Sequence, residues 1–111
     1  MPLLQINTNI SIKDPASVVK QASTLVATML GKPESYVMVV LNPELNLVFA
    51  GSDEAAAHLK LKSLGLPESE TSQYSEQLCS FMEKLGVKPA RTYIEFSGPP
   101  RNMWGWNGST F

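Results

Sequence analysis

In the first half of the chain, apolar residues recur with a period of about two and then of about 3.6. The short run from Leu3 to Asn7 has the alternation of a strand. A helix is predicted to begin at Asp14-Pro15, because an Asp side chain accepts hydrogen bonds from first-turn amides and proline fits the first helical position. Gly31 ends this helix as a C-cap. Its predicted buried face consists of Val18, Val19, Ala22, Leu25, Val26, Met29 and Leu30.

Two further strands are predicted before the midpoint. Residues Tyr36 to Leu41 form a nearly continuous apolar run rich in β-branched residues, which predicts a central strand covered on both faces. Asn42-Pro43 predicts a turn. A short strand is then expected from Leu45 to Ala50.

The second half repeats this plan. Leu59 to Leu64 alternates as a half-buried strand, and the polar stretch from Pro67 to Ser72 opens a second helix that Gly86 closes. The next strand is predicted from Thr92 to Phe96, and the tail from Ser97 to Phe111 is rich in Gly, Pro, Asn and aromatic residues. The apolar positions of the second helix are Tyr74, Leu78, Phe81, Met82 and Leu85.

An internal repeat is visible in the letters. Leu30-Gly31-Lys32-Pro33 precedes Tyr36, and Leu85-Gly86-Val87-Lys88-Pro89 precedes Tyr93. We therefore predict one domain with pseudo-repeats at about 1–56 and 57–111. The fold class is α/β (α+β), with two βαβ repeats forming a four-stranded mixed sheet and both helices on one face.

That layout leaves one face of the sheet without cover. The apolar run from Tyr36 to Leu41 would then be partly exposed, which favours association with other chains. The sequence therefore predicts an oligomer, although this argument does not fix the number of subunits.

Composition and charge exclude several classes of function. The chain has 111 residues and a net charge of −1, with no basic run, so binding to nucleic acid is not expected. No stretch is long and apolar enough to span a membrane, and no secretory signal is recognised at the N-terminus. The only cysteine is Cys79, which excludes an intramolecular disulfide. These features predict a cytoplasmic protein.

An ordered set of short motifs gives the chain a family resemblance. Met1-Pro2, Asn7-Thr8-Asn9, Gly31-Lys32-Pro33 and Ser63-Leu64-Gly65 come in sequence, and the tail reads Gly-Trp-Asn-x-Ser-Thr-Phe. Together with Gly51-Ser52, Tyr74-Ser75, Leu78-Cys79 and Tyr93-Ile94, this order resembles the macrophage migration inhibitory factor family over essentially the whole chain. The resemblance implies a homotrimer of sheets with active sites at the subunit interfaces, and a tautomerase that acts on phenylpyruvate and dopachrome-type compounds without a cofactor.

Pro2 is the candidate catalytic residue. Removal of Met1 would expose a secondary amine, and burial or nearby positive charge would lower its pKa and make it a general base. If Met1 is retained, Pro2 sits in an amide and cannot act in this way. Second-position proline is also common for reasons unrelated to catalysis.

The resemblance assigns substrate-binding roles to three further residues of the same chain. Lys32 would lower the pKa of the Pro2 amine and bind the carboxylate of an α-keto acid, although a lysine at a helix C-terminus is also favourable for the helix alone. Leu64 would offer its backbone N–H to the substrate, and Ser63 would assist the loop or serve only as a turn residue.

Two residues on the last predicted strand are also candidates. Tyr93 would reach the pocket from a neighbouring subunit and donate a hydrogen bond, or it is an ordinary strand aromatic. Glu95 points to the same sheet face. The better-known family members carry asparagine there, so a carboxylate either repels an acidic substrate or pairs with Lys32.

Aromatic residues of the tail complete the predicted pocket. Trp104, Trp106 and Phe111 suit a flat ring such as that of phenylpyruvate. Trp104 replaces a smaller aliphatic residue of the better-known members, which predicts a narrower pocket. Trp106 and Phe111 could equally serve subunit packing, and Met103 is placed at the rim.

The sequence offers no metal cluster, since His58 is the only histidine and Cys79 is expected in the core. The family's Cys-x-x-Cys is absent after Gly51-Ser52, so thiol-disulfide activity is not expected. Asn107-Gly108-Ser109 matches the glycosylation pattern, and we interpret it as a structural turn.

Other functions remain open at this stage. Animal members of the family act as extracellular ligands, so receptor binding, with secretion by a non-classical route, is one alternative. A dehalogenase or decarboxylase of the wider tautomerase superfamily is another, in which Glu95 would activate water. A ferredoxin-like regulatory domain would explain the βαβ repeat but not the combination of Pro2 and Lys32.

Overall fold

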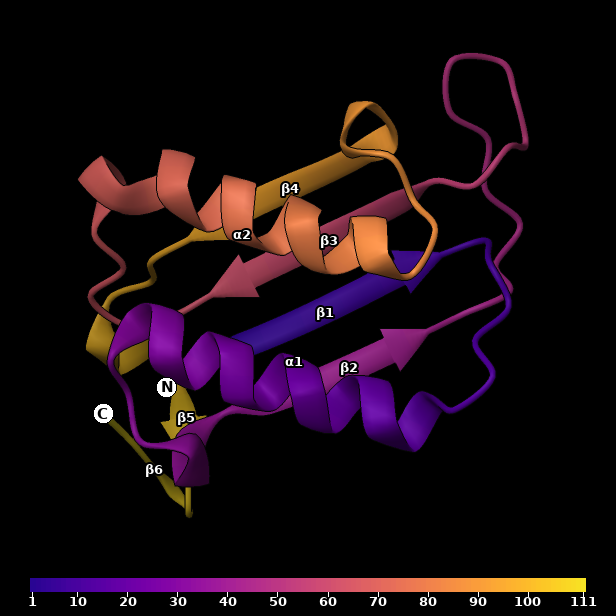
Figure 1. Cartoon of the computed structure of the whole chain (residues 1–111). Helices are drawn as coiled ribbons and strands as arrows, with labels where there is room; N and C mark the ends of the chain where they lie inside the picture. Colours follow the sequence, from indigo (N-terminus) through magenta and orange to yellow (C-terminus); the bar gives the residue numbers. More distant parts are fainter.

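A computed structural model describes residues 1–111 and shows a four-stranded sheet with both long helices on one of its faces (Figure 1). The first half contains strand β1 (Leu3–Thr8), helix α1 (Pro15–Leu30) and strand β2 (Met38–Asn42). The second half contains β3 (Ala57–Lys62), α2 (Thr71–Lys84) and β4 (Thr92–Ser97), followed by the short strands β5 (Gly105–Trp106) and β6 (Ser109–Thr110). The predicted mixed sheet built from two βαβ units is confirmed, whereas the boundary between repeats at 56/57 stays a prediction.

The strand order of the sheet is β2-β1-β3-β4. β1 runs parallel to β2 and antiparallel to β3, and β3 runs parallel to β4. The register places Leu3 opposite Lys62, and Lys62 opposite Ser97. The two βαβ units therefore meet along β1 and β3 at the centre of the sheet, and the chain enters the sheet beside the end of β3.

The hydrophobic core lies between the sheet and the two helices. Strand alternation directs Leu4, Ile6, Leu59 and Leu61 toward the helices, and all four side chains are fully buried. The helices contribute Ala22, Val26, Leu78 and Met82 to the same cluster. The spacing of apolar residues predicted these helix faces, because the residues in question recur every three to four positions.

Both predicted ends of α1 are confirmed. The Asp14 side chain accepts a hydrogen bond from the Ser17 backbone N–H at 3.1 Å, and Pro15 is the first helical residue. Gly31 terminates the helix in the left-handed conformation, at φ 61°, which glycine adopts without steric cost. This C-cap directs the chain toward Lys32 and the region of the N-terminus.

The prediction of a central strand from Tyr36 to Leu41 was wrong in two respects. Tyr36 belongs to a 3-10 turn at Glu34–Tyr36, and β2 is an edge strand that pairs with β1 alone. Only alternate residues of β2 face the helices, so Met38 and Val40 are 62 % and 38 % exposed on the other face. A continuous apolar run therefore marks a strand whose outer face is uncovered within one chain.

The strand predicted from Leu45 to Ala50 does not form. This segment contains only an isolated bridge between Phe49 and Ser52, closed by a tight turn in which Ala50 and Gly51 both have positive φ. A strand needs a neighbouring strand to satisfy its backbone groups, and no segment of this chain lies beside residues 45–48 in a ladder.

The strand predicted from Leu59 to Leu64 begins and ends two residues earlier than expected, so Ser63 and Leu64 lie just beyond β3.

The interpretation of Asn107-Gly108-Ser109 as a turn is confirmed. Asn107 and Gly108 form the two-residue connection between β5 and β6, both with positive φ, as an Asn-Gly hairpin turn requires. This hairpin lies beside the N-terminus (Figure 1).

Candidate functional site

A cavity of about 490 Å³ opens beside the N-terminal residues. Pro2 is buried directly before β1, and its carbonyl oxygen accepts a hydrogen bond from the backbone N–H of Met38 at 3.0 Å. The N-terminus, the chain entering β2, the end of β3 and the C-terminal segment line this cavity. The twelve lining residues are Met1, Pro2, Leu3, Ser35, Tyr36, Val37, Met38, Lys62, Met103, Trp104, Gly105 and Trp106.

Aromatic side chains form much of the cavity wall. The rings of Tyr36 and Trp106 meet edge to face with their centres 5.8 Å apart. Trp106 stacks on Phe111 at 5.7 Å, and the Phe111 backbone N–H donates to the Trp104 carbonyl oxygen at 3.2 Å. Phe111 therefore supports the wall from behind, while Trp104 and Trp106 face the space, which suits a flat ring.

Two cations act on the terminal amine. In the structure this amine belongs to Met1, and its pKa lies below the ordinary value, first because burial removes solvent from the charged form and then because of the charges of Lys32 and Arg101. Lys32 is not a lining residue, but its charge reaches the amine. The surroundings therefore shift the terminal amine toward its neutral form relative to an amine in water.

Ser63 and Leu64 lie directly after Lys62, which is paired with Leu3 in the adjacent strand, and both are buried outside the cavity lining. The Ser63 hydroxyl donates to the Leu64 carbonyl oxygen at 3.4 Å. The backbone N–H of Leu64 donates no hydrogen bond within the chain. This N–H group is therefore available as a donor at the edge of the sheet where β1 begins and β3 ends.

Tyr93 and Glu95 lie elsewhere in the chain. Tyr93 is 64 % exposed, pairs with His58 across the sheet and packs edge-on against Phe49. His58 precedes Lys62 by four residues on β3, so Tyr93 lies roughly 13 Å along the strands from the cavity end of the sheet. Within one chain, neither Tyr93 nor Glu95 lines the cavity beside Pro2.

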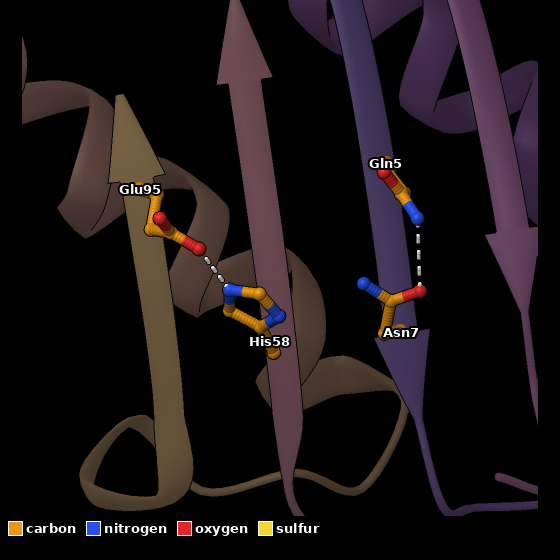
Figure 2. A network of polar contacts seen from close by, with 4 residues as sticks. All are labelled: Gln5, Asn7, His58 and Glu95. Carbon is orange, nitrogen blue, oxygen red and sulfur yellow. Dashed lines mark hydrogen bonds and ion pairs between the residues drawn. The ribbon is translucent and has the colours of Figure 1, made fainter. Parts of the chain in front are cut away.

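The uncovered sheet face carries a set of polar side chains (Figure 2). The Glu95 carboxylate on β4 contacts the His58 ring on β3, and both groups are partly exposed. On β1, the Gln5 amide donates to the Asn7 side-chain oxygen at 3.2 Å. Within one chain Glu95 thus pairs with His58, and its expected effect in the assembled site, either repulsion of an acidic substrate or pairing with Lys32, stays a prediction.

Sequence reasoning missed several residues at this site. Tyr36 was assigned to a strand, and Lys62 and Arg101 were given no role. The alternation Leu-Lys-Leu-Lys from Leu59 to Lys62 placed Lys62 on the outer sheet face, but only the pairing with Leu3 shows that this position borders the N-terminus. Met103, which we placed at the rim, does line the cavity.

Two further observations concern binding classes. No three side chains of the His, Cys, Asp and Glu types lie close enough together to hold a metal ion. Neither helix has the length and hydropathy that crossing a lipid bilayer requires.

The fold and the cavity together define a class of small α+β proteins. Here two βαβ units form one four-stranded sheet, and the second residue is a proline at an aromatic cavity with cations nearby.

Comparison with known proteins places the chain within this class. The sequence model of the macrophage migration inhibitory factor family matches residues 1–111. The macrophage migration inhibitory factor homologue of Trichinella spiralis is 39 % identical, with all of both chains covered, and that of Brugia malayi is 38 % identical over 100 % of this chain and 99 % of the relative. The crystal structure of a homologue from Prochlorococcus marinus superposes with a TM-score of 0.93 at 38 % identity, covering 98 % of each chain. The chain belongs to the macrophage migration inhibitory factor family. This family is part of the tautomerase superfamily, and membership supports an isomerase activity of the chain in general terms.

Proposed function

We propose that this protein is a keto–enol tautomerase of aromatic α-keto acids such as phenylpyruvate, and of dopachrome-type compounds, with Pro2 as the general base after Met1 is removed. One observation carries the proposal. Pro2 is buried beside an aromatic cavity, and burial, Lys32 and Arg101 lower the pKa of the terminal amine that the adjacent Met1 carries in this structure. A neutral secondary amine is the form that can accept a proton.

The proposed reaction is a proton transfer within the substrate. The Pro2 nitrogen takes a proton from the carbon next to the keto group, and the electron pair left behind forms the carbon–carbon double bond of an enolate. The enolate oxygen then takes a proton from solvent water and gives the enol, and the protonated Pro2 amine releases its proton to solvent. In the reverse direction the protonated Pro2 amine delivers a proton to the carbon, and the enol oxygen releases its proton. Lys32 binds the carboxylate, and Lys32 together with the unpartnered Leu64 N–H stabilises the developing negative charge. The step needs no cofactor.

The active enzyme is proposed to be a homotrimer with sites at the subunit interfaces. Met38 and Val40 are exposed on a sheet face that the helices leave uncovered, and covering such apolar groups favours association. A neighbouring chain would bring Tyr93 and Glu95 to the cavity of the first, with Tyr93 as a hydrogen-bond donor and Ser63 supporting the Leu64 loop. Trp104, Trp106 and Phe111 would hold the ring of the substrate.

The rival reading as a dehalogenase depends on Glu95 as the residue that activates water. In this structure the Glu95 carboxylate is already engaged by His58, which is an argument against that role. Turnover of haloacrylates without turnover of phenylpyruvate would favour the rival.

The decisive experiment joins mass determination of the purified chain to an enol-formation assay with phenylpyruvate. Chains that have lost Met1 are expected to be active, and chains that retain Met1 are expected to be inactive, because an amide nitrogen is not basic. Pro2→Gly in the processed chain keeps a free amine but loses the secondary amine and its rigid placement, so it should be much slower. Equal rates for wild type and Pro2→Gly would remove Pro2 from the mechanism.

A further inference from the structure

Lys62 is the only charged side chain among the residues that line the cavity. The other side chains of the lining are apolar or aromatic, apart from the hydroxyl of Ser35 and that of Tyr36. No carboxylate lines the space. An ammonium group in such surroundings attracts an anion, because no internal counterion neutralises it.

The ammonium group of Lys62 is held against the cavity wall. Its nitrogen lies 5.7 Å from the centre of the Trp104 ring, within the range of a cation–π contact. The only ion pair in the chain joins His58 to Glu95, so Lys62 has no carboxylate partner. The indole ring therefore orients the ammonium group of Lys62, and the N–H donors of that ammonium group stay free to bind a ligand.

Lys62 acts at a different place from the cations beside the amine. Lys32 and Arg101 lower the pKa of the terminal amine, whereas Lys62 projects from the outer face of β3 and packs against the tryptophan wall. A cavity of about 490 Å³ falls within the size range of sites that hold drug-sized ligands, roughly 300 to 1,000 Å³. There is thus room beside the aromatic wall for more than one anionic group on a ligand.

We propose that Lys62 is a second anion-binding group of the Pro2 cavity, and that the preferred substrates are aromatic α-keto acids with a second carboxylate on the ring. This inference rests on the proposed function, since it names the substrate class for the same site. The α-keto carboxylate would bind at Lys32, the ring would lie along Trp104 and Trp106, and the distal carboxylate would pair with Lys62.

The test compares phenylpyruvate with its para-carboxy derivative in three variants. Lys62→Met removes the charge and keeps an apolar stem, and Lys62→Arg keeps the charge. Lys60→Met is the matched control, because Lys60 lies on the same strand and the same face but does not line the cavity.

We expect the KM for the carboxylated substrate to be about threefold to fivefold lower than the KM for phenylpyruvate, because a partly solvated ion pair contributes only modestly to binding. This preference should appear in wild type, Lys62→Arg and Lys60→Met. Lys62→Met should lose this preference, so that the ratio of its two KM values falls to about one. The preference should also shrink as salt is raised, because mobile ions screen the pair. Equal KM values for both substrates in wild type, or a preference that survives in Lys62→Met, would overturn the proposal.

A binding measurement separates this proposal from the proposed function. Tryptophan fluorescence reports the occupancy of the cavity by 4-carboxyphenylacetate and by phenylacetate, neither of which carries a keto group. Tighter binding of the dianion that depends on Lys62 would support the anion site even if no variant turns over a keto acid. Equal binding of the two compounds would reject it even if Pro2-dependent tautomerisation is found.

Discussion

The guanidinium carbon of Arg91 lies 5.2 Å from the centre of the Phe49 ring, and the ring of Phe49 in turn meets Tyr93 edge-on at 4.9 Å. The same guanidinium donates hydrogen bonds at 2.9 to 3.1 Å to four carbonyl oxygens, those of Phe49, Ser52, Glu54 and Ala55. Arg91 therefore fixes the segment between β2 and β3 against the start of β4. It also fixes the ring on which Tyr93 rests.

Replacing Arg91 by lysine should destabilise the fold by about 2 kcal/mol, since a lysine cannot reproduce the planar array of donors and several carbonyl oxygens would lose their charged partner. The measurement is chemical denaturation of the two proteins. Arg101→Lys is the control, because Arg101 is an exposed arginine that forms no ion pair within the chain. Equal stability of Arg91→Lys and the control would show that the four contacts contribute little.

The acid limb of the pH–rate profile should depend on Lys32. Only the neutral amine accepts a proton, so kcat/KM rises as pH increases through the pKa of the Pro2 amine. Burial, then Lys32 and then Arg101 lower the pKa of the terminal amine in this structure. Removing the Lys32 charge should therefore raise the pKa and move the acid limb of Lys32→Gln to higher pH.

The internal repeat supplies a matched control for this experiment. Lys88 stands before Pro89 as Lys32 stands before Pro33, but its charge is not among the causes that lower the pKa of the terminal amine. Lys88→Gln should keep the profile of wild type. An acid limb that stays in place in Lys32→Gln would separate Lys32 from the basicity of the amine.

The helices could be predicted from the sequence because their signals are local. Asp14-Pro15 and Gly31 act within one turn of α1, and the apolar spacing of α2 depends on residues only three or four positions apart. The strands depend on partners distant in the chain. The run from Tyr36 to Leu41 therefore gave no sign that its strand lies at an edge, and residues 45–50 gave no sign that they lack a partner.

Prediction of the candidate site from the sequence was limited in the same way, by contacts between residues distant in the chain. Pro2, Trp104 and Trp106 were predicted and line one cavity. Tyr36 and Lys62 join them only because β1 pairs with both β2 and β3 and because the C-terminal hairpin lies beside the N-terminus. These are long-range pairings, which the local sequence pattern does not encode.

Tyr74 should make the protein sensitive to alkali. Burial, followed by the charge of Glu70, raises the pKa of its phenol above the ordinary value. Below the ordinary pKa the phenol is protonated in both the folded and the unfolded chain, so its ionisation does not change the free energy of unfolding. As pH rises toward the folded-state pKa, the unfolded chain ionises first and stability is lost. Tyr74→Phe should therefore lose less stability than wild type between neutral pH and pH above about 10, as measured by denaturation at several pH values. A parallel decline in both proteins would exclude the phenol as the cause.

The carboxylate of Glu95 should weaken the binding of acidic substrates in the assembled protein. Glu95 and His58 are partly exposed on the uncovered sheet face, so their contact should contribute at most about 1 kcal/mol to stability, and Glu95→Gln should still fold. If a neighbouring chain brings Glu95 to the cavity, as proposed, removing its negative charge should lower KM for phenylpyruvate with little change in kcat. Glu83→Gln on the exposed side of α2 is the control for a general change in net charge. A KM that falls equally in both variants would reflect net charge alone, and a KM unchanged in Glu95→Gln would place this carboxylate outside the substrate site.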